Sequence, residues 1–349
     1  MQRIAAQSPK ASQALALVSQ LQRRFVEQLE TLCQEAGSPQ GFDAVEWCRD
    51  EGRHGGGIRY STGDGDIIGR GSVNVSQVHY DDMPDKKLAS ANAISTIIHP
   101  KHPHAPSVHI HISWTEMRDG HGYWRMMADL NPAIPNEEAR TQFLHALQQA
   151  APEVFEEACA QGDRYFWIPV LQRHRGVAHF YLEQYHTDDA QADMMLAQKI
   201  GETTIDTYVS ILQHAIQHAP QVTEQDQAQQ LAYHTLYFFQ VLTLDRGTTT
   251  GLLVHNQNDL GIMGSLPALV DRELLQSWLA KMPQPQEALL QGLIDALPET
   301  KPALVDDAVK VALTQVVRQH YQQHPEAIAL QASGDVIPPT VNNHASIKA

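Results

Sequence analysis

The stretch Ile94–Trp114, ISTIIHPKHPHAPSVHIHISW, decides the fold of this chain. Its two ends, residues 94–99 and 107–114, are rich in β-branched side chains, which predicts two β-strands. No helix is expected between them, because proline fixes φ and lacks the backbone N–H that a helix needs. Prolines occupy positions 100, 103 and 106. The stretch therefore predicts two strands joined by an irregular connection.

The second of these strands alternates apolar and polar side chains. Successive side chains of a strand point to opposite faces, so three apolar residues would face a core and three polar ones the opposite side. The apolar set is Val108, Ile110 and Ile112, and the polar set is His109, His111 and Ser113. A polar face that carries two histidines is typical of a functional site.

These histidines allow more than one kind of chemistry. Neutral imidazoles two residues apart on a strand can reach one metal ion, and His99 is a further candidate ligand beside His109. A histidine that titrates near neutrality also serves as a general acid or base without any metal. A third alternative is that the histidines only face solvent or a polar pocket.

The remaining chain separates strand-like from helix-like segments. Helical spacing of apolar residues predicts a helix over Ser12–Glu35, and glycine-punctuated runs over 44–80 predict antiparallel strands. Residues 122–130 resemble a further strand, and 136–161 one helix. Long helices are expected again from about Thr187 onward. We therefore predict an α+β fold in a single domain, residues 1–324, with a C-terminal tail over 325–349.

Composition excludes several functional classes. The 349 residues contain 25 Lys and Arg against 40 Asp and Glu, a net charge of −15. This charge argues against a general nucleic-acid partner or an anionic membrane surface. Three scattered cysteines form no disulfide framework, and no apolar run is long enough to span a membrane. We expect a cytoplasmic protein without a membrane span.

Two further segments carry candidate functional side chains. Asp129 follows an apolar strand and could accept hydrogen bonds or a proton, or it caps the turn that follows it. Arg246 lies in the turn 245–248, before a predicted short strand over 251–254. It could bind a carboxylate with two N–H groups, or form an internal ion pair.

Several motifs together resemble the oxygen-dependent coproporphyrinogen III oxidase family. SVNVSQVHY (72–80) is similar to the family's GVNxSxVHG, SxxIHPxxPxxPxVH (95–109) to SxVIHPxNPxxPTVH, and ADLNP (128–132) to ADLTP. Arg175-Gly176-Val177, LDRGTTTGL (244–252) and GSLPAL (264–269) follow in the family's order. The resemblance spans about residues 47–270.

The resemblance implies a large, flat, mostly antiparallel sheet between helices on both faces, in a homodimer. Family enzymes convert two propionates of coproporphyrinogen III to vinyl groups in haem biosynthesis, with O2 as co-substrate. They release CO2 and peroxide, and many need no metal or organic cofactor. The implied substrate is a porphyrinogen or another tetrapyrrole. Some bacterial members carry metal-ligand histidines, two of which match His99 and His109, so a divalent metal is a further expectation.

Site residues follow by position in the motifs. His109 matches the family's proton donor, and Asp129 the carboxylate that faces the pyrrole nitrogens. The residues that match or neighbour its substrate contacts are Ser95, Lys101, His111, Ile112, Ser113, Arg246 and Gln257. Arg125 is a further candidate for binding a propionate.

The chain also departs from the family at these contacts. His111 and Ser113 replace an asparagine and an arginine, Lys101 replaces an arginine, and residues 255–257 replace a glycine-glycine-arginine segment. Losing arginines from propionate sites predicts an altered substrate. Two alternatives to the oxidase follow: a relative that binds haem or another tetrapyrrole, and a metal-dependent enzyme on the same scaffold.

Overall fold

The computed structural model describes residues 2–218, 220–255, 257–334 and 340–346. One seven-stranded antiparallel sheet organises them, in the strand order β1-β2-β3-β4-β5-β6-β9. The strands are Asp43–Cys48 (β1), Gly55–Gly63 (β2), Ile68–His79 (β3), Leu88–Pro100 (β4), Ser107–Met117 (β5), Gly122–Asn131 (β6) and Ala178–Tyr185 (β9). Two short ladders pair Trp167–Ile168 (β7) with Arg173–His174 (β8), and Leu269–Val270 (β10) with Ala303–Leu304 (β11).

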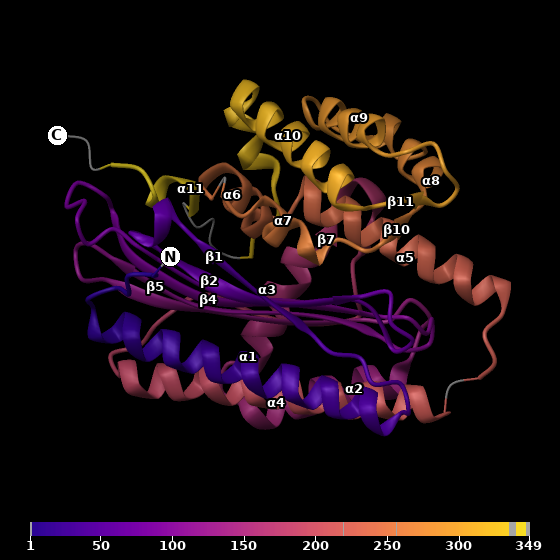
Figure 1. Cartoon of the computed structure of the whole chain (residues 1–349), viewed down its shortest axis with the longest axis horizontal. Coiled ribbons are helices and arrows are strands. Elements are labelled where there is room, and N and C mark those ends of the chain that lie inside the picture. The colour runs from indigo at the N-terminus through magenta and orange to yellow at the C-terminus, as the bar shows by residue number, and fades with distance from the viewer. Residues whose placement is uncertain (1, 219, 256, 335–339, 347–349) are drawn as a thin grey trace.

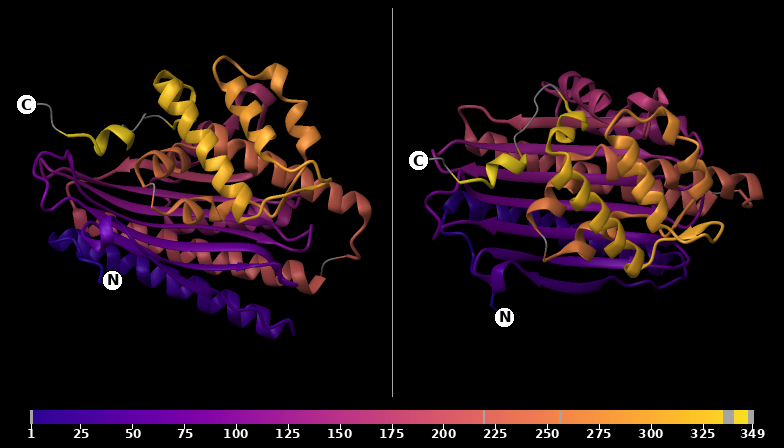
Figure 2. Two further views of the ribbon diagram at one scale, coloured as in Figure 1. Left: turned by 45° about the horizontal axis from the view of Figure 1, so that its top comes forward. Right: turned by 90° about the horizontal axis from the view of Figure 1, so that it is seen from above.

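Helices cover both faces of the sheet (Figure 1). The lower face in that view carries Pro9–Glu35 (α1), Glu137–Ala150 (α2) and Ala190–His218 (α4), while Phe155–Phe166 (α3) packs on β9. The upper face carries the later helices, which Figure 2 shows from above. They are Glu224–Thr243 (α5), Arg246–Val254 (α6), Asp259–Ile262 (α7), Arg272–Gln276 (α8), Gln286–Ala296 (α9), Asp307–Gln323 (α10) and Thr340–Asn343 (α11).

The alternation along β5 separates the two sides of the sheet. Val108, Ile110 and Ile112 are at most 1% exposed and belong to the core between the sheet and helices α1 and α4. Their polar neighbours face the upper layer. The strand register then aligns these polar residues with those of adjacent strands: Ser95 and Ile97 of β4 lie opposite His111 and His109, and Arg125 of β6 lies opposite Ser113. The sheet thus has one apolar face and one largely polar face.

The predicted α+β class is confirmed, with an antiparallel sheet between helical layers. The strands predicted over 94–99 and 107–114 fall within β4 and β5, and the first helix matches α1. In the described part of the chain, no helix combines the length and apolar character needed to cross a bilayer.

Two local predictions were wrong. Residues 251–254 form the end of α6 rather than a strand, because the Asp245 carboxylate caps this helix by accepting a hydrogen bond from the Thr248 amide at 2.7 Å. The helix predicted over 136–161 is interrupted after Ala150, and α3 begins only at Phe155. Pro152 lies in this break, where its missing N–H cannot continue the helical ladder.

Candidate active site

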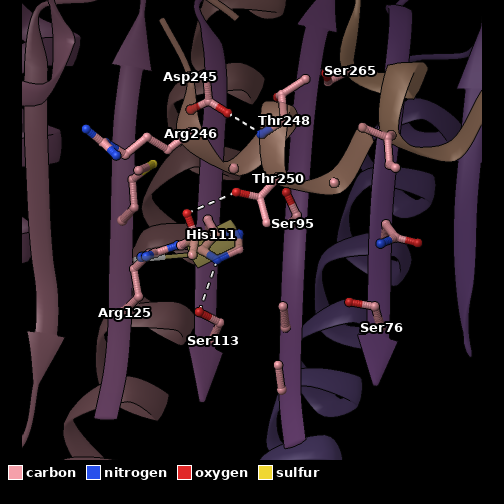
Figure 3. A pocket seen from close by; sticks show the side chains of 18 of the residues that line it. Ser76, Ser95, His111, Ser113, Arg125, Asp245, Arg246, Thr248, Thr250 and Ser265 are labelled. Carbon is pink, nitrogen blue, oxygen red and sulfur yellow. Dashed lines mark hydrogen bonds between the residues drawn. The ribbon is translucent and has the colours of Figure 1, made fainter. Parts of the chain in front are cut away.

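A pocket lies between the polar face of the sheet and the helices above it. It encloses about 1580 Å³ of empty space, including its opening to solvent. The floor comes from β3, β4, β5, β6 and β9, and the roof from α5, α6 and the C-terminal residues Thr340, Asn343 and His344. Figure 3 shows part of this lining. Ser95, His111, Ser113 and Arg125 are labelled on the floor in that view.

His109 connects the floor to a buried ion pair. Its Nδ1–H donates to Asp129 Oδ1 at 3.0 Å, across the β5–β6 register. Asp129 is fully buried, and its second oxygen accepts from Arg175 at 2.7 Å and from Asn131 at 2.6 Å. Since Nδ1 is occupied, the Nε2 atom of His109 is the one available to a ligand.

The partners of Asp129, not its burial, keep this network charged. Burial alone would raise the pKa of Asp129, but Arg175, His109 and Asn131 together hold it below its ordinary value. The Arg175 guanidinium is itself 1% exposed and is held between the rings of Phe166 and Tyr237, 4.6 and 4.8 Å from their centroids. Asp129 is therefore a permanent anion that orients His109.

A second group on the floor combines a neutral histidine with a cation. His111 Nε2 and Ser113 Oγ share a hydrogen bond of 3.1 Å. Burial, with Arg125 and His109 nearby, lowers the pKa of His111 to about 3, so the ring is neutral near pH 7. Arg125 reaches the same space from β6; its nearest carboxylate oxygen, on Glu183, is 3.7 Å away, and its Nε has no hydrogen-bond partner among the described residues. This arrangement suits a ligand carboxylate.

The start of α6 forms part of the roof. Asp245 accepts hydrogen bonds from the Tyr165 hydroxyl at 2.7 Å and from the Thr248 amide. The next residue, Arg246, is 4% exposed and donates from Nε to the carbonyl of Ala332 at 2.6 Å. One of its terminal nitrogens has no hydrogen-bond partner in the described part of the chain. Arg246 is thus anchored at one nitrogen and available at another.

The structure brings only some of the predicted site residues to the pocket. Ser95, His109, His111, Ser113 and Arg246 line it. Four others do not line it: Asp129, Lys101, Ile112 and Gln257.

The structure explains why each of these four residues does not line the pocket. Both oxygens of Asp129 are occupied within the protein, so it does not face a ligand and acts through His109. The side chain of Ile112 belongs to the opposite core, because it alternates with its polar neighbours. Lys101 is largely exposed near Asp64, and Gln257 is hydrogen bonded to Asp50 outside the pocket.

His99 does not join His109 in a metal site. Its Nδ1 is hydrogen bonded to Ser107 at 2.9 Å and its Nε2 to the Ser265 carbonyl at 3.2 Å, so both ring nitrogens are occupied. Burial lowers the pKa of His99 well below its ordinary value. Over the residues that the structure describes, no three His, Cys, Asp or Glu side chains meet as metal ligands would.

Sequence reasoning missed three contributors to the site. Arg175 was noted only as part of a motif, and its pairing with Asp129 spans 46 residues. Tyr237 on α5 had no polar pattern that distinguished it from its apolar neighbours. The C-terminal residues Thr340, Asn343 and His344 lie in a segment that had been expected to be a tail, yet they line the pocket.

Comparison with known proteins places these features in a family context. Residues 13–294 match the coproporphyrinogen III oxidase family. The oxygen-dependent coproporphyrinogen-III oxidase, mitochondrial, of Rattus norvegicus is 27% identical over 261 residues, which cover 68% of this chain and 58% of that protein. The protein of that name in Homo sapiens is 25% identical over 281 residues, covering 72% of this chain and 61% of the relative. The matched region thus spans about three fifths of each relative.

Proposed function

The chain belongs to the coproporphyrinogen III oxidase family, and from this premise we propose that it is an oxygen-dependent oxidase of a coproporphyrinogen-type tetrapyrrole. The observation that carries the proposal is the His109–Asp129–Arg175 network beneath the pocket, whose lining also includes Arg125 and Arg246. Per side chain, –CH2–CH2–COOH and O2 give –CH=CH2, CO2 and H2O2. Two electrons pass to O2 as the carboxyl carbon leaves as CO2.

The pocket residues have distinct parts in this chemistry. His109 accepts a proton from a pyrrole N–H at Nε2, and Asp129 stabilises the resulting imidazolium through the Nδ1–H bond. Arg175 keeps Asp129 ionised, so the carboxylate does not take the proton itself. Arg125 and Arg246 supply positive charge for propionate carboxylates.

The direct test is aerobic incubation with coproporphyrinogen III, with products separated by chromatography. We expect O2-dependent loss of CO2 and formation of a vinyl product, and His109→Ala should lower kcat by about 10²–10⁴-fold, as for loss of a general base. His121→Ala is the matched control, because His121 is exposed and lies outside the pocket lining. Absence of O2-dependent product from the purified wild-type protein would refute the proposal.

Two further predictions rest on the family resemblance. The reaction should need no metal or organic cofactor, so metal analysis and treatment with a chelator should find activity independent of bound metal. Light scattering of the purified protein should give the mass of a homodimer.

A third prediction rests on composition, because the cysteines are few and scattered and no apolar run is long enough to span a membrane. Cell fractionation should place the protein in the cytoplasm.

One departure from the family favours a second candidate function. Ser113 replaces an arginine of the family, and His111 beside it is a neutral imidazole in the pocket. A neutral imidazole is the form that binds haem iron. Titration with haemin should then shift the Soret band, with the shift lost in His109→Ala and His111→Ala variants. The absence of a shift would exclude haem binding at this face.

A further inference from the structure

Two histidines from distant parts of the chain meet at one end of the pocket. His255 follows α6, and His344 follows α11; their ring centroids are 5.3 Å apart, and both line the pocket. Helices α6 and α11 lie side by side above the sheet in Figures 1 and 2. His344 lies beyond residue 294, where the family match ends. This end of the pocket is therefore built partly by residues outside the matched region.

Hydrogen bonds fix the tautomer of His344. The Tyr80 hydroxyl accepts a hydrogen bond from an Arg49 terminal nitrogen at 2.7 Å, because a guanidinium can only donate. The same hydroxyl then has its own proton left to donate, and its partner is His344 Nδ1 at 3.0 Å. His344 Nδ1 is thus an acceptor. The proton of the neutral ring must lie on Nε2.

The tautomer of His255 follows from the same guanidinium. The other terminal nitrogen of Arg49 is hydrogen bonded to His255 Nδ1, and again only the arginine can donate. His255 Nδ1 is therefore an acceptor, and its proton also lies on Nε2. Among the described residues, the side-chain hydrogen bonds of both rings are made at Nδ1, which leaves each Nε2–H to donate to a ligand.

The two histidine rings are neutral, and the cations near them favour binding of an anion. Burial and the nearby Arg49 lower the pKa of His344 to about 3 and that of His255 well below its ordinary value, so both rings are neutral donors. Arg49 lies behind them, and Lys86 donates to the His344 carbonyl at 3.1 Å. Among the described residues, the carboxylate paired with Arg49 is that of Asp50, 3.6 Å from its Nε, whereas the two terminal nitrogens of Arg49 bind Tyr80 and His255.

We propose that His255 and His344 form a carboxylate-binding subsite, in which both Nε2–H groups donate to one carboxylate of the ligand and Arg49 supplies the positive charge behind them. The subsite rests on the proposed function, since it assigns a place to one propionate of the tetrapyrrole. Arg125 and Arg246 lie elsewhere in the same pocket. We therefore expect a ligand that carries more than one carboxylate.

The subsite also accounts for the C-terminal segment. Thr340 is hydrogen bonded to Thr250 at 3.0 Å, and Asn343 donates to the Tyr123 hydroxyl at 3.3 Å. A bridge between Lys86 and Ser346 continues the attachment. These contacts hold His344 over the pocket, so the segment determines which ligand edge is recognised.

The test measures binding of coproporphyrin III, the oxidised and unreactive porphyrin, by quenching of protein fluorescence near pH 7.5. His344→Phe keeps the ring but removes the donor and should weaken binding about tenfold, which corresponds to about 1.4 kcal/mol. His255→Phe should weaken it similarly. The tetramethyl ester of the same porphyrin, added in a small fraction of organic co-solvent, should bind the wild type and His344→Phe equally.

Controls separate the subsite from folding and from the oxidase. Asn342→Ala, on the exposed side of α11, should bind like the wild type. Tyr80→Phe, which removes the hydroxyl that fixes the His344 tautomer, gives a second variant should His344→Phe unfold. The subsite is overturned if His344→Phe and Tyr80→Phe both bind coproporphyrin III as tightly as the wild type does, or if the wild type does not bind it at all. Binding without turnover of coproporphyrinogen contradicts only the oxidase, and turnover with unchanged affinity contradicts only the subsite.

Discussion

At the scale of single residues, the buried ion pair between Asp129 and Arg175 has the largest predicted effect. Both side chains are almost inaccessible, at 0% and 1% exposure, so Asp129→Asn leaves a buried guanidinium without its anion. Removing one partner of a buried pair typically costs about 3–5 kcal/mol. We expect a loss of this size in the free energy of unfolding, measured by urea denaturation.

A surface pair provides the control for this measurement. Glu137 and Arg140 form an ion pair at 2.7 Å, with 76% and 42% of their side chains exposed. Exposed pairs contribute about 0–1 kcal/mol, so Glu137→Gln should change stability little. Equal losses in the two variants would contradict the description of Asp129 as the anion of a buried network.

On the pocket floor, a double substitution can move the positive charge of Arg125 from β6 to the neighbouring strand β5. Ser113 and Arg125 lie directly opposite each other in the β5–β6 register. Arg125→Ser should weaken coproporphyrin binding, because a desolvated carboxylate loses a charged partner at a cost of about 2–5 kcal/mol. Adding Ser113→Arg to this variant should restore part of the affinity, measured by the same fluorescence titration. No loss in Arg125→Ser would exclude Arg125 from carboxylate binding.

At the scale of elements, the alternation of side chains along β5 could be predicted from the sequence, because strand geometry dictates it. The partners of β5 could not, since cross-strand pairs such as Ser113 and Arg125 depend on the register of the folded sheet. The cap at Asp245 was missed for a different reason. Its turn residues suit a loop as well as a helix start, and only the Thr248 amide decides between them.

Helix α3 approaches the sheet closely because it contains a glycine. A Cβ atom at Gly162 would lie 2.7 Å from the His179 Cβ and 3.1 Å from its backbone carbon on β9. Gly162→Ala should therefore destabilise the protein by about 1–3 kcal/mol, the cost of overpacking, although alanine favours a helix. Thermal and urea unfolding measure the change.

The matched control lies in the same helix. Ala160 is exposed, so Ala160→Gly should cost only about 0.5–1 kcal/mol through helix propensity. A stabilising effect of Gly162→Ala would show that α3 can move away from β9 without loss.

At the scale of the whole molecule, the histidines predict how stability depends on pH. Burial holds His111 at a pKa of about 3, His234 and His320 at about 4, and His99 well below its ordinary value. In the unfolded chain these residues take up protons near pH 6.5. Between pH 6.5 and about 4 the unfolded state therefore binds more protons than the folded state, and stability falls as pH falls.

The size of this effect can be measured. Each such histidine contributes up to about 1.4 kcal/mol per pH unit, so urea midpoints should decrease steadily from pH 7 to pH 5. His234→Phe replaces one of these rings and should flatten the slope. A midpoint that is constant over this range would contradict the neutral, buried state of the histidines.

The sequence predicts more of the overall architecture than of the site. Motifs 72–80, 95–109 and 128–132 fall on strands or their ends and identified the sheet. The network at Asp129 could not be inferred, because Arg175 is distant in sequence. The contribution of His344 was missed because the last residues have no apolar period, and their polar contacts exist only in the folded chain.

The separation of an apolar and a polar face of the sheet also affects how the ligand of this protein can change in evolution. Along β5, the floor residues alternate with residues of the opposite core, as His111 does between Ile110 and Ile112. A substitution on the floor changes what the pocket recognises while leaving the packing between the sheet and helices α1 and α4 untouched. Relatives with this architecture can therefore exchange the floor residues of β5 and acquire new ligands while keeping the core that holds α1 and α4 against the sheet.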